Sequence, residues 1–210
     1  GRAHKARHKQ EIFSLQPPLM AVKTSRGCVY RCNFCTSNPW SRAGLSGKVY
    51  RTHSTAYLQR HATLLRETYG VTRLVVLDEL ANVAAPHFDG ILDVAEGLDL
   101  GLDFPNGMRA DRITRSQVTR MAARCAVLSI SAESATERVA NELIGKRFAL
   151  EATERVARWC QQDGLRLVVH WMIGQPTETR VEILETLKTA WGLYEHTGAE
   201  PLLQFATPIA

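Results

Sequence analysis

The chain alternates short apolar runs with stretches that have helical periodicity. Apolar runs predict six strands, at 19–23, 73–77, 102–104, 126–130, 165–173 and 202–205. Between them, apolar residues recur every three or four positions, as on the buried face of an amphipathic helix. Strands and helices that alternate about thirty residues apart are typical of βα units, which form a mostly parallel sheet covered by helices.

Two of the predicted helices have clear boundary residues. Ser54 is suited to cap the first helix, because its hydroxyl can accept a main-chain hydrogen bond, and Gly70 can end that helix in the left-handed conformation. The predicted apolar face of this helix is Tyr57, Leu58, His61, Leu64 and Leu65. Thr177 is predicted to cap the last helix, whose inward residues would be Ile183, Leu184, Leu187, Trp191 and Tyr194.

The six units are compatible with a doubly wound open sheet and with a partial barrel. In both architectures the carboxyl ends of the parallel strands meet at one edge, and ligands bind there. The polar residues that follow each strand are therefore the first candidates for a functional site.

Composition favours one soluble domain. The chain has 210 residues, of which 45% are hydrophobic, which is enough for a single sizeable core. No apolar run approaches the ~20 residues needed to cross a bilayer. Five cysteines, an odd number with three of them inside Cys28–Cys35, fit metal or redox chemistry in a reducing compartment better than a disulfide framework, and we expect a cytoplasmic protein.

Positive charge is concentrated at the start of the chain. The formal net charge of +5 owes much to Arg2, Lys5, Arg7 and Lys9. A basic segment of this kind can contact RNA or membrane phosphates, but a solvated linker is the simpler interpretation. We therefore expect residues 1–18 to be a linker and residues 19–210 to be one core domain, taken from a longer protein.

The strongest chemical signal is the spacing C-x-x-x-C-x-x-C at Cys28, Cys32 and Cys35, directly after the first strand. Three thiolates on one short loop can each bind one iron of a [4Fe-4S] cluster and leave the fourth iron open to a cofactor or substrate. Two alternatives remain. A structural zinc site would need a fourth ligand from His53, Cys125 or Cys160, and ordinary free cysteines would need no metal at all.

This loop carries a resemblance to a known family. The run Thr24-Ser-Arg-Gly-Cys-Val-Tyr-Arg-Cys-Asn-Phe-Cys35 resembles the signature of the radical S-adenosylmethionine (SAM) superfamily. It is most similar to the branch that includes cobalamin-dependent methylases and methylthiotransferases. The resemblance implies a partial (β/α)6 barrel of the TIM type, with parallel strands and with the cluster and SAM at their carboxyl ends. It also implies that the cluster reductively cleaves SAM to a 5′-deoxyadenosyl radical.

The resemblance further implies cofactor contacts at the first three strand ends. Phe34, between the second and third cysteines, would lie against the adenine, with core packing as the alternative. Asp78 and Glu79 resemble the acidic pair that contacts the methionyl amine, although a helix cap or a solvated turn would also explain them. Arg109 resembles an arginine that would grip a carboxylate, and a surface ion pair with Asp111 is the alternative.

The later strands carry weaker matches. Glu133 would bind ribose hydroxyls or the methionyl amine, or else cap the following helix, and Ser131 stands where the family usually has glycine. Gly174 would let the backbone approach the adenosine closely, and Thr177 replaces a second glycine. His170 is compatible with a contact to cofactor or substrate and equally with a core position. Cys125 and Cys160 are expected to be buried thiols.

Three functions are consistent with these residues. The first is cobalamin-dependent methylation, or another radical change at an unactivated carbon, with cobalamin bound by a domain outside this chain. The second is a tRNA methylthiotransferase type of modification, and the third is a zinc-stabilised binding module. We expect a small-molecule or peptide substrate and an external electron donor of the flavodoxin or ferredoxin type, and we do not favour a nucleic-acid partner.

Overall fold

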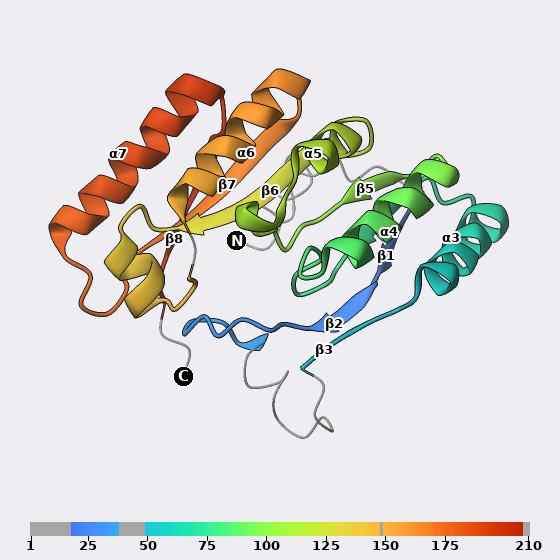
Figure 1. Ribbon diagram of the computed structural model, residues 1–210, viewed down its shortest axis with the longest axis horizontal. Helices are drawn as coiled ribbons and strands as arrows, with labels where there is room; N and C mark the ends of the chain where they lie inside the picture. Colours follow the sequence, from blue (N-terminus) through green and yellow to red (C-terminus); the bar gives the residue numbers. More distant parts are fainter. Residues whose placement is uncertain (1–17, 38–48, 148, 208–210) are drawn as a thin grey trace.

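The computed structural model describes residues 18–37, 49–147 and 149–207, so most of the predicted linker 1–18 lies outside the described residues. The six predicted strands are present and parallel within two half-sheets (Figure 1). The first half-sheet has the order β1-β4-β5, made of Leu19–Val22, Arg73–Val76 and Gly101–Asp103. The second has the order β6-β7-β8, made of Val127–Glu133, Arg166–Ile173 and Glu200–Phe205.

Met108 joins the two half-sheets. It forms a parallel bridge to Ile130. Its N–H donates to the Ser129 carbonyl at 2.8 Å, and its own carbonyl accepts from the Ser131 N–H at 3.2 Å. The six strands therefore form one curved, open layer, as in a partial barrel.

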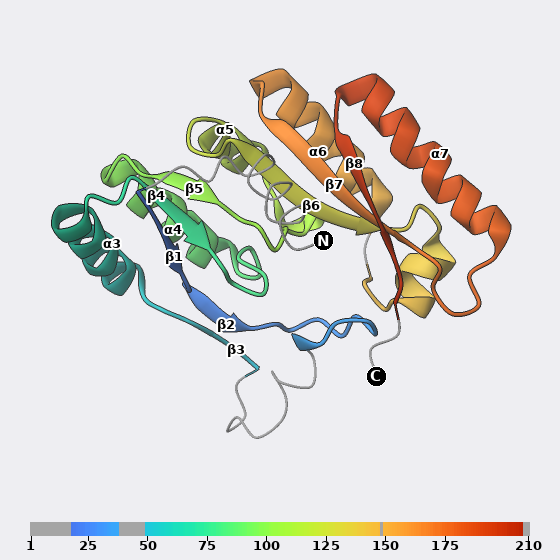
Figure 2. The same cartoon turned by 180° about the vertical axis from the view of Figure 1, so that it is seen from behind.

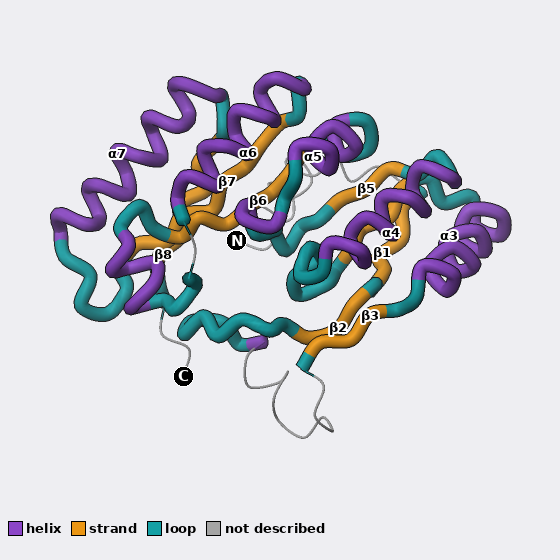
Figure 3. The backbone as a smooth tube through the Cα atoms, viewed as in Figure 1, coloured by secondary structure: helices purple, strands orange, loops and turns teal. Residues whose placement is uncertain are grey.

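Within the described ranges, five α-helices cover one side of this layer (Figures 1 and 3). They are α3 Thr55–Tyr69, α4 Ala85–Gly97, α5 Arg115–Ala122, α6 Leu150–Asp163 and α7 Arg180–Thr197. Because the helices lie on one side rather than on both, the fold is the partial (β/α)6 barrel and not the doubly wound sheet. No helix in the described ranges is long and apolar enough to cross a membrane.

Strand β7 shows how the sheet separates the core from the open side. Leu167, Val169 and Trp171 belong to the main hydrophobic core, and alternate residues point to the opposite face of a strand. On that opposite face, Val168 packs with Val127 in a second, small cluster. Polar residues that share this face of β6 and β7, at every second position from these two valines, therefore face the inside of the barrel.

Helix α3 has the predicted ends but a narrower buried face. The Ser54 hydroxyl accepts from the Tyr57 N–H, and Gly70 ends the helix with a φ of 65°. The buried residues are Leu58, Ala62 and Leu65. Tyr57 and Leu64 are 40% and 54% exposed, so the prediction that they face inward was wrong. Helix α3 packs against α4, and Tyr57 and Leu64 lie outside its buried face.

Two predictions for the last helix were also wrong. Its N-cap is Thr179, which forms a capping box with Glu182, while Thr177 lies in the preceding turn with a φ of 70°. The buried residues of α7 are Thr186, Ala190 and Leu193. The predicted inward residues Leu184, Leu187, Trp191 and Tyr194 are 46%, 36%, 58% and 42% exposed. Helix α7 is apolar on more than one face, and its small side chains face the sheet.

Three short elements were not predicted. An antiparallel hairpin pairs β2 Ser25–Gly27 with β3 Tyr50–Thr52, and it places the cysteine loop. Gly27 has a φ of 90°, and a Cβ on it would lie 2.0 Å from the Val49 carbonyl oxygen, so this position requires glycine. A 3-10 turn at Ala110–Arg112 and a π-helix at Arg138–Leu143 complete the described elements.

Candidate functional site

The three cysteines lie on a loop that crosses the open end of the barrel. Cys28, Cys32 and Cys35 form no disulfide and are partly exposed. The loop starts at β2, beside the first half-sheet, and runs to the second (Figures 1 and 2). There the Asn33 N–H donates to the Ile144 carbonyl at 2.9 Å. The cysteines are therefore held at the carboxyl ends of the strands, as predicted.

The thiols are close enough to influence one another. Burial raises the pKa of Cys28 and of Cys32, and the nearby Cys35 raises each of them further. Two cations act in the opposite direction. Arg109 lowers the pKa of Cys28, and Lys146 lowers that of Cys32. A cation beside a cysteine favours the thiolate, which is the form that binds metal.

The donor set fits a cluster better than a single ion. Within the described ranges, no group of three or more His, Cys, Asp or Glu side chains is arranged to hold a metal ion. The proposed extra zinc ligands Cys125 and Cys160 lie in the hydrophobic core, where burial raises the pKa of each to about 12. A cluster places its three thiolates on three separate irons, so they need not converge on one point.

Asp78, at the end of β4, is bonded to the segment that precedes the cysteines. It is 2% exposed. Its Oδ1 accepts from the Thr24 N–H at 2.7 Å, and its Oδ2 accepts from the hydroxyls of Thr24 and Ser25 at 2.6 Å each. The His87 Nε2 lies 3.0 Å from the Thr24 hydroxyl. Both carboxylate oxygens thus hold the chain in place, a role that the sequence did not predict.

Glu79 holds the same segment from its more exposed side. Its Oε2 accepts from the Gly27 N–H at 3.1 Å, and its Oε1 forms an ion pair with Lys23 at 2.8 Å. Burial opposes ionisation of Glu79, but the hydrogen bonds from Lys23 and Gly27 keep its pKa below the usual value. Glu79 is therefore ionised, and it is bonded to Gly27, the residue before Cys28.

Arg109 forms the ion pair with Asp111, but in a buried position rather than on the surface. It is 4% exposed, and its Nε and Nη2 donate to the two Asp111 oxygens at 2.9 Å each. Nη1 and Nη2 also donate to the carbonyls of Lys146 and Arg147 at 2.8 and 3.0 Å. Its guanidinium lies 4.0 Å from the centre of the Tyr30 ring. The predicted carboxylate-gripping residue thus ties the cysteine loop to residues 146–147.

Glu133 forms a buried ion pair that sequence reasoning missed. The Lys146 Nζ donates to Glu133 Oε1 at 2.8 Å and to the Ser131 carbonyl at 2.6 Å. Ser131 stands in place of the usual glycine, and the pairing of β6 with β7 shifts register between Ser131 and Glu133. Gly107 leaves room for the serine: a Cβ on Gly107 would lie 3.2 Å from the Ser131 hydroxyl. Lys146 stands thirteen residues after Glu133 in the chain, and no periodic pattern connects the two.

His170 faces the inside of the barrel and is hydrogen-bonded. Its Nε2 lies 2.7 Å from the Ser129 hydroxyl on the neighbouring strand. Burial lowers its pKa, while Glu133 raises it and Lys146 lowers it. His170 pairs with Ser131 on β6, whose carbonyl accepts from Lys146, so it lies near the Glu133–Lys146 pair. The neutral ring can donate or accept a hydrogen bond with a bound molecule.

Two further predicted residues lie on exposed turns. Gly174 has a φ of 84°, and its N–H and that of Gln175 donate to Glu178. No described atom lies within 4 Å of a Cβ placed on Gly174, so an incoming molecule can approach the backbone there. Phe34 is 36% exposed, so the alternative that it packs in the core was wrong. Contacts of both residues with a cofactor stay predictions.

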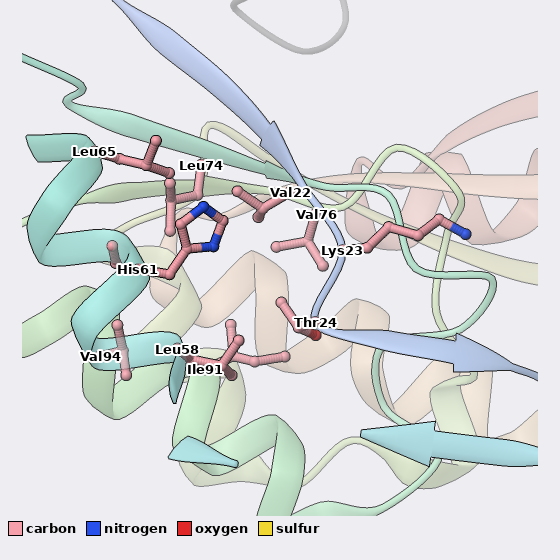
Figure 4. Close-up of a pocket in the computed structure, with 11 residues that line it drawn as sticks. Val22, Lys23, Thr24, Leu58, His61, Leu65, Leu74, Val76, Ile91 and Val94 are labelled. Carbon is pink, nitrogen blue, oxygen red and sulfur yellow. The ribbon is translucent and has the colours of Figure 1, made fainter. Parts of the chain in front are cut away.

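A separate crevice lies between β1, β4 and helices α3 and α4 (Figure 4). Its free space is about 20 Å³, which holds about one water molecule. The His61 ring lies between apolar side chains of α3 and β4 in this view, and Lys23 points away from it. The crevice is too small for a cofactor, so it belongs to the packing beneath the sheet.

Two curated methyltransferases are similar to this chain in sequence. No family model matches the chain. An uncharacterized methyltransferase from Pyrococcus horikoshii is 27% identical over 179 residues, which are 82% of this chain and 37% of that protein. Cytidylyl-2-hydroxyethylphosphonate methyltransferase from Streptomyces wedmorensis is 25% identical over 200 residues, 94% of this chain and 36% of that protein. The chain thus spans just over a third of these curated relatives.

Solved structures confirm the fold. The radical SAM methyltransferase TsrM from Kitasatospora setae, with cobalamin and a [4Fe-4S] cluster bound, superposes with a TM-score of 0.71 at 19% identity, over 90% of this chain and 36% of that one. The cobalamin-dependent radical enzyme OxsB, with aqua-cobalamin bound, gives 0.62 at 21% identity, over 81% and 26%. The partial-barrel fold is therefore confirmed, and the reaction of this chain is a separate question.

Proposed function

We propose that this chain is the catalytic core of a radical SAM enzyme that holds a [4Fe-4S] cluster on Cys28, Cys32 and Cys35. The observation that carries the proposal is the position of these three partly exposed thiols, on one loop across the carboxyl ends of a partial barrel. The similarity to curated methyltransferases supports it. When bound, the cluster and SAM would supply a one-electron cleavage of the sulfonium that produces an organic radical.

The residues around the loop have two kinds of role in this proposal. Asp78 and Arg109 are positioning residues, because their polar atoms bind the chain on either side of the cysteines. Glu79 and Glu133 are carboxylates suited to an ammonium group or to ribose hydroxyls, with Lys146 neutralising Glu133.

The remaining site residues would orient the nucleoside and the substrate. Ser131 and His170 provide hydrogen-bonding groups on the inner face of the barrel. Gly174 exposes a backbone edge that adenosine can approach, and Phe34 provides a partly exposed ring suited to stacking on an adenine. The enclosing strands would keep water from the reacting atoms.

The reaction we propose is methylation of a carbon in a small molecule, with cobalamin held by a part of the protein outside this chain. Two observations support methylation over the tRNA methylthiolation alternative. The curated relatives are named as methyltransferases, and TsrM has been solved with a tryptophan substrate and a SAM analogue. We further propose that the protein works in the cytoplasm, where the three thiols would stay reduced.

Anaerobic reconstitution with iron and sulfide tests the proposal. We expect about four irons per chain, and formation of methionine or another cleavage product when the reduced protein meets SAM. Changing Cys28, Cys32 or Cys35 to alanine should abolish stable iron binding. The matched control, Cys125→Ala, removes a buried thiol of the core and should retain the iron. Equal iron content in all four variants, or zinc as the bound metal, would refute the proposal.

A further inference from the structure

Thr24 uses all of its polar groups, and it lies shortly before the first cysteine of the loop. It is 4% exposed. Its N–H donates to Asp78 Oδ1 at 2.7 Å, and its carbonyl accepts from the His53 N–H at 2.9 Å. Its hydroxyl oxygen lies 2.6 Å from Asp78 Oδ2 and 3.0 Å from His87 Nε2. The end of β4, the first turn of α4 and the residue before the α3 cap therefore meet at this one side chain and its backbone.

The two distances at the Thr24 hydroxyl show where its single proton lies. A hydroxyl that donates to a carboxylate forms a short bond of about 2.5–2.7 Å. An N–H donor commonly lies about 2.9–3.0 Å from the oxygen that accepts from it. The bond to Asp78 has the first length, and the contact with His87 has the second. Thr24 therefore gives its proton to Asp78, and its oxygen accepts a proton from His87.

The other contacts of Asp78 agree with this direction. Its Oδ2 also accepts from the Ser25 hydroxyl at 2.6 Å, and its Oδ1 accepts from the Thr24 N–H. Asp78 is thus the acceptor in every one of these contacts, as an ionised carboxylate must be. If Thr24 donated to His87 instead, the short contact between the Thr24 and Asp78 oxygens would have no proton unless Asp78 supplied one.

His87 lies where a neutral ring is favoured. It is buried in the first turn of α4, which begins at Ala85, and the positive end of the helix dipole disfavours a cation there. Burial lowers the pKa of His87, Asp78 opposes that shift, and His53 adds to it. A neutral imidazole carries one proton, on either Nδ1 or Nε2. The contact with Thr24 requires that this proton be on Nε2.

We propose that His87 is a positioning residue for the cysteine loop, acting as a neutral Nε2–H donor that reaches Asp78 through Thr24. The hydrogen-bond relay runs from His87 Nε2–H to Thr24 Oγ1, and from Thr24 Oγ1–H to Asp78 Oδ2. Linked hydrogen bonds polarise and strengthen one another. The relay is a property of this chain, and its effect on a bound cluster rests on the proposed function.

The relay fixes the corner from which the cysteine loop starts. Thr24 and Ser25 lie where β1 gives way to β2, and β2 leads through Gly27 to Cys28. Without the His87 donor, the buried Thr24 oxygen loses a hydrogen bond, and the bond to Asp78 loses the polarisation that strengthens it. The thiols would then be held less firmly, so a bound cluster should lose its iron faster.

The position of the His87 proton tests the relay without any destabilising change. In the full chain labelled with nitrogen-15 at histidine, two-bond correlations between ring nitrogens and ring hydrogens distinguish the Nε2–H form from the Nδ1–H form. The spectrum of His87→Gln identifies the signals of His87 among the seven histidines. We expect the proton on Nε2 at neutral pH. A proton on Nδ1, either alone or together with one on Nε2, would overturn the proposal.

Two amide variants separate the donor from the bulk of the ring. The amide nitrogen of glutamine can reach the position of Nε2, whereas that of asparagine reaches only the position of Nδ1. In the reconstituted chain, we expect His87→Asn to speed iron loss to EDTA about tenfold and His87→Gln to stay within about twofold of wild type. The control, His196→Asn, changes an exposed histidine of α7 and should leave the rate unchanged. Equal rates for the two His87 variants would overturn the relay.

A double-mutant cycle shows whether His87 acts through Thr24. Thr24→Val removes the hydroxyl, and Thr24→Ser keeps it. His87→Asn should add little iron loss to Thr24→Val but should keep its full effect beside Thr24→Ser. Additive effects with Thr24→Val would mean that His87 acts by another route, and would refute the proposal. If the wild-type chain takes up no cluster, the proposed function fails while the proton position still decides the relay, so the two failures are distinguishable.

Discussion

At the scale of single residues, Thr177 is the clearest place where the chain is strained. It is a β-branched residue with a φ of 70°, a conformation that costs non-glycine residues about 1–2 kcal/mol. Thr177→Gly should therefore stabilise the fold by roughly 0.5–1 kcal/mol, since glycine loses part of this gain through its greater freedom in the unfolded chain. Urea unfolding measures the difference, and a variant less stable than wild type would contradict the strain.

Asp78 gives a second residue-scale prediction. Asp78→Ala leaves the Thr24 N–H and two hydroxyls without their acceptor, so we expect a loss of roughly 2–4 kcal/mol in unfolding free energy and poorer iron loading. Asp78→Asn should lose much less, because the two hydroxyls can accept as well as donate.

Iron content after reconstitution and urea unfolding check both variants. Asp93→Ala, which removes an exposed partner of Arg120, is the control and should change stability by less than about 1 kcal/mol. If Asp78→Ala matched this control in both measurements, the positioning role would be wrong.

These residues also show what the sequence can and cannot predict about the site. The cysteine spacing and the polar residues at strand ends were visible because they are local features. The bonds from Asp78 to Thr24 and Ser25 connect residues more than fifty positions apart, and the residues of the Glu133–Lys146 pair lie on either side of a π-helix in the chain. Tertiary packing sets such contacts. The sequence therefore predicted Asp78 and Glu133 as site residues, but not the residues to which they are bonded.

At the scale of elements, the start of α7 offers a test by pH. Arg138 and Thr179 hold the carboxylate of Glu182 and lower its pKa to about 2. A lowered pKa stabilises the fold above the unfolded value of 4.5, and that stabilisation is lost as the pH falls from 4.5 towards 2.

We therefore expect wild type to melt at a higher temperature than Glu182→Gln at neutral pH, with the difference shrinking as the pH is lowered to about 3. Thermal unfolding followed by circular dichroism measures it. A difference that stays constant over this range would show that the charge of Glu182 contributes nothing to the capping.

Elements also differ in how well the sequence defines them. The strands and the two ends of α3 were predicted closely, because apolar runs and residues such as Ser54 and Gly70 act locally. The inward face of α7 was predicted wrongly, since apolar residues lie on several of its faces and only tertiary contacts choose Thr186 and Ala190. The β2–β3 hairpin was missed because its strands are three residues long and lie more than twenty residues apart.

At the scale of the whole molecule, the cysteine loop connects the two half-sheets. It leaves β2 beside the first and is bonded to Ile144 beside the second. Asp78 and Glu79 anchor one end, and Arg109 and residues 143–147 anchor the other. The arrangement explains how a short loop with few contacts of its own can hold three thiols in fixed positions at the open end of a barrel.

The central claim is that three cysteines bind three irons of a cluster and leave the fourth for SAM. Mössbauer spectroscopy of protein reconstituted with iron-57, before and after SAM is added, tests it most directly. The account predicts that SAM changes the signal of one iron in four and leaves the other three unchanged. A spectrum with four equivalent irons that SAM does not alter, or with no cluster signal, would contradict it.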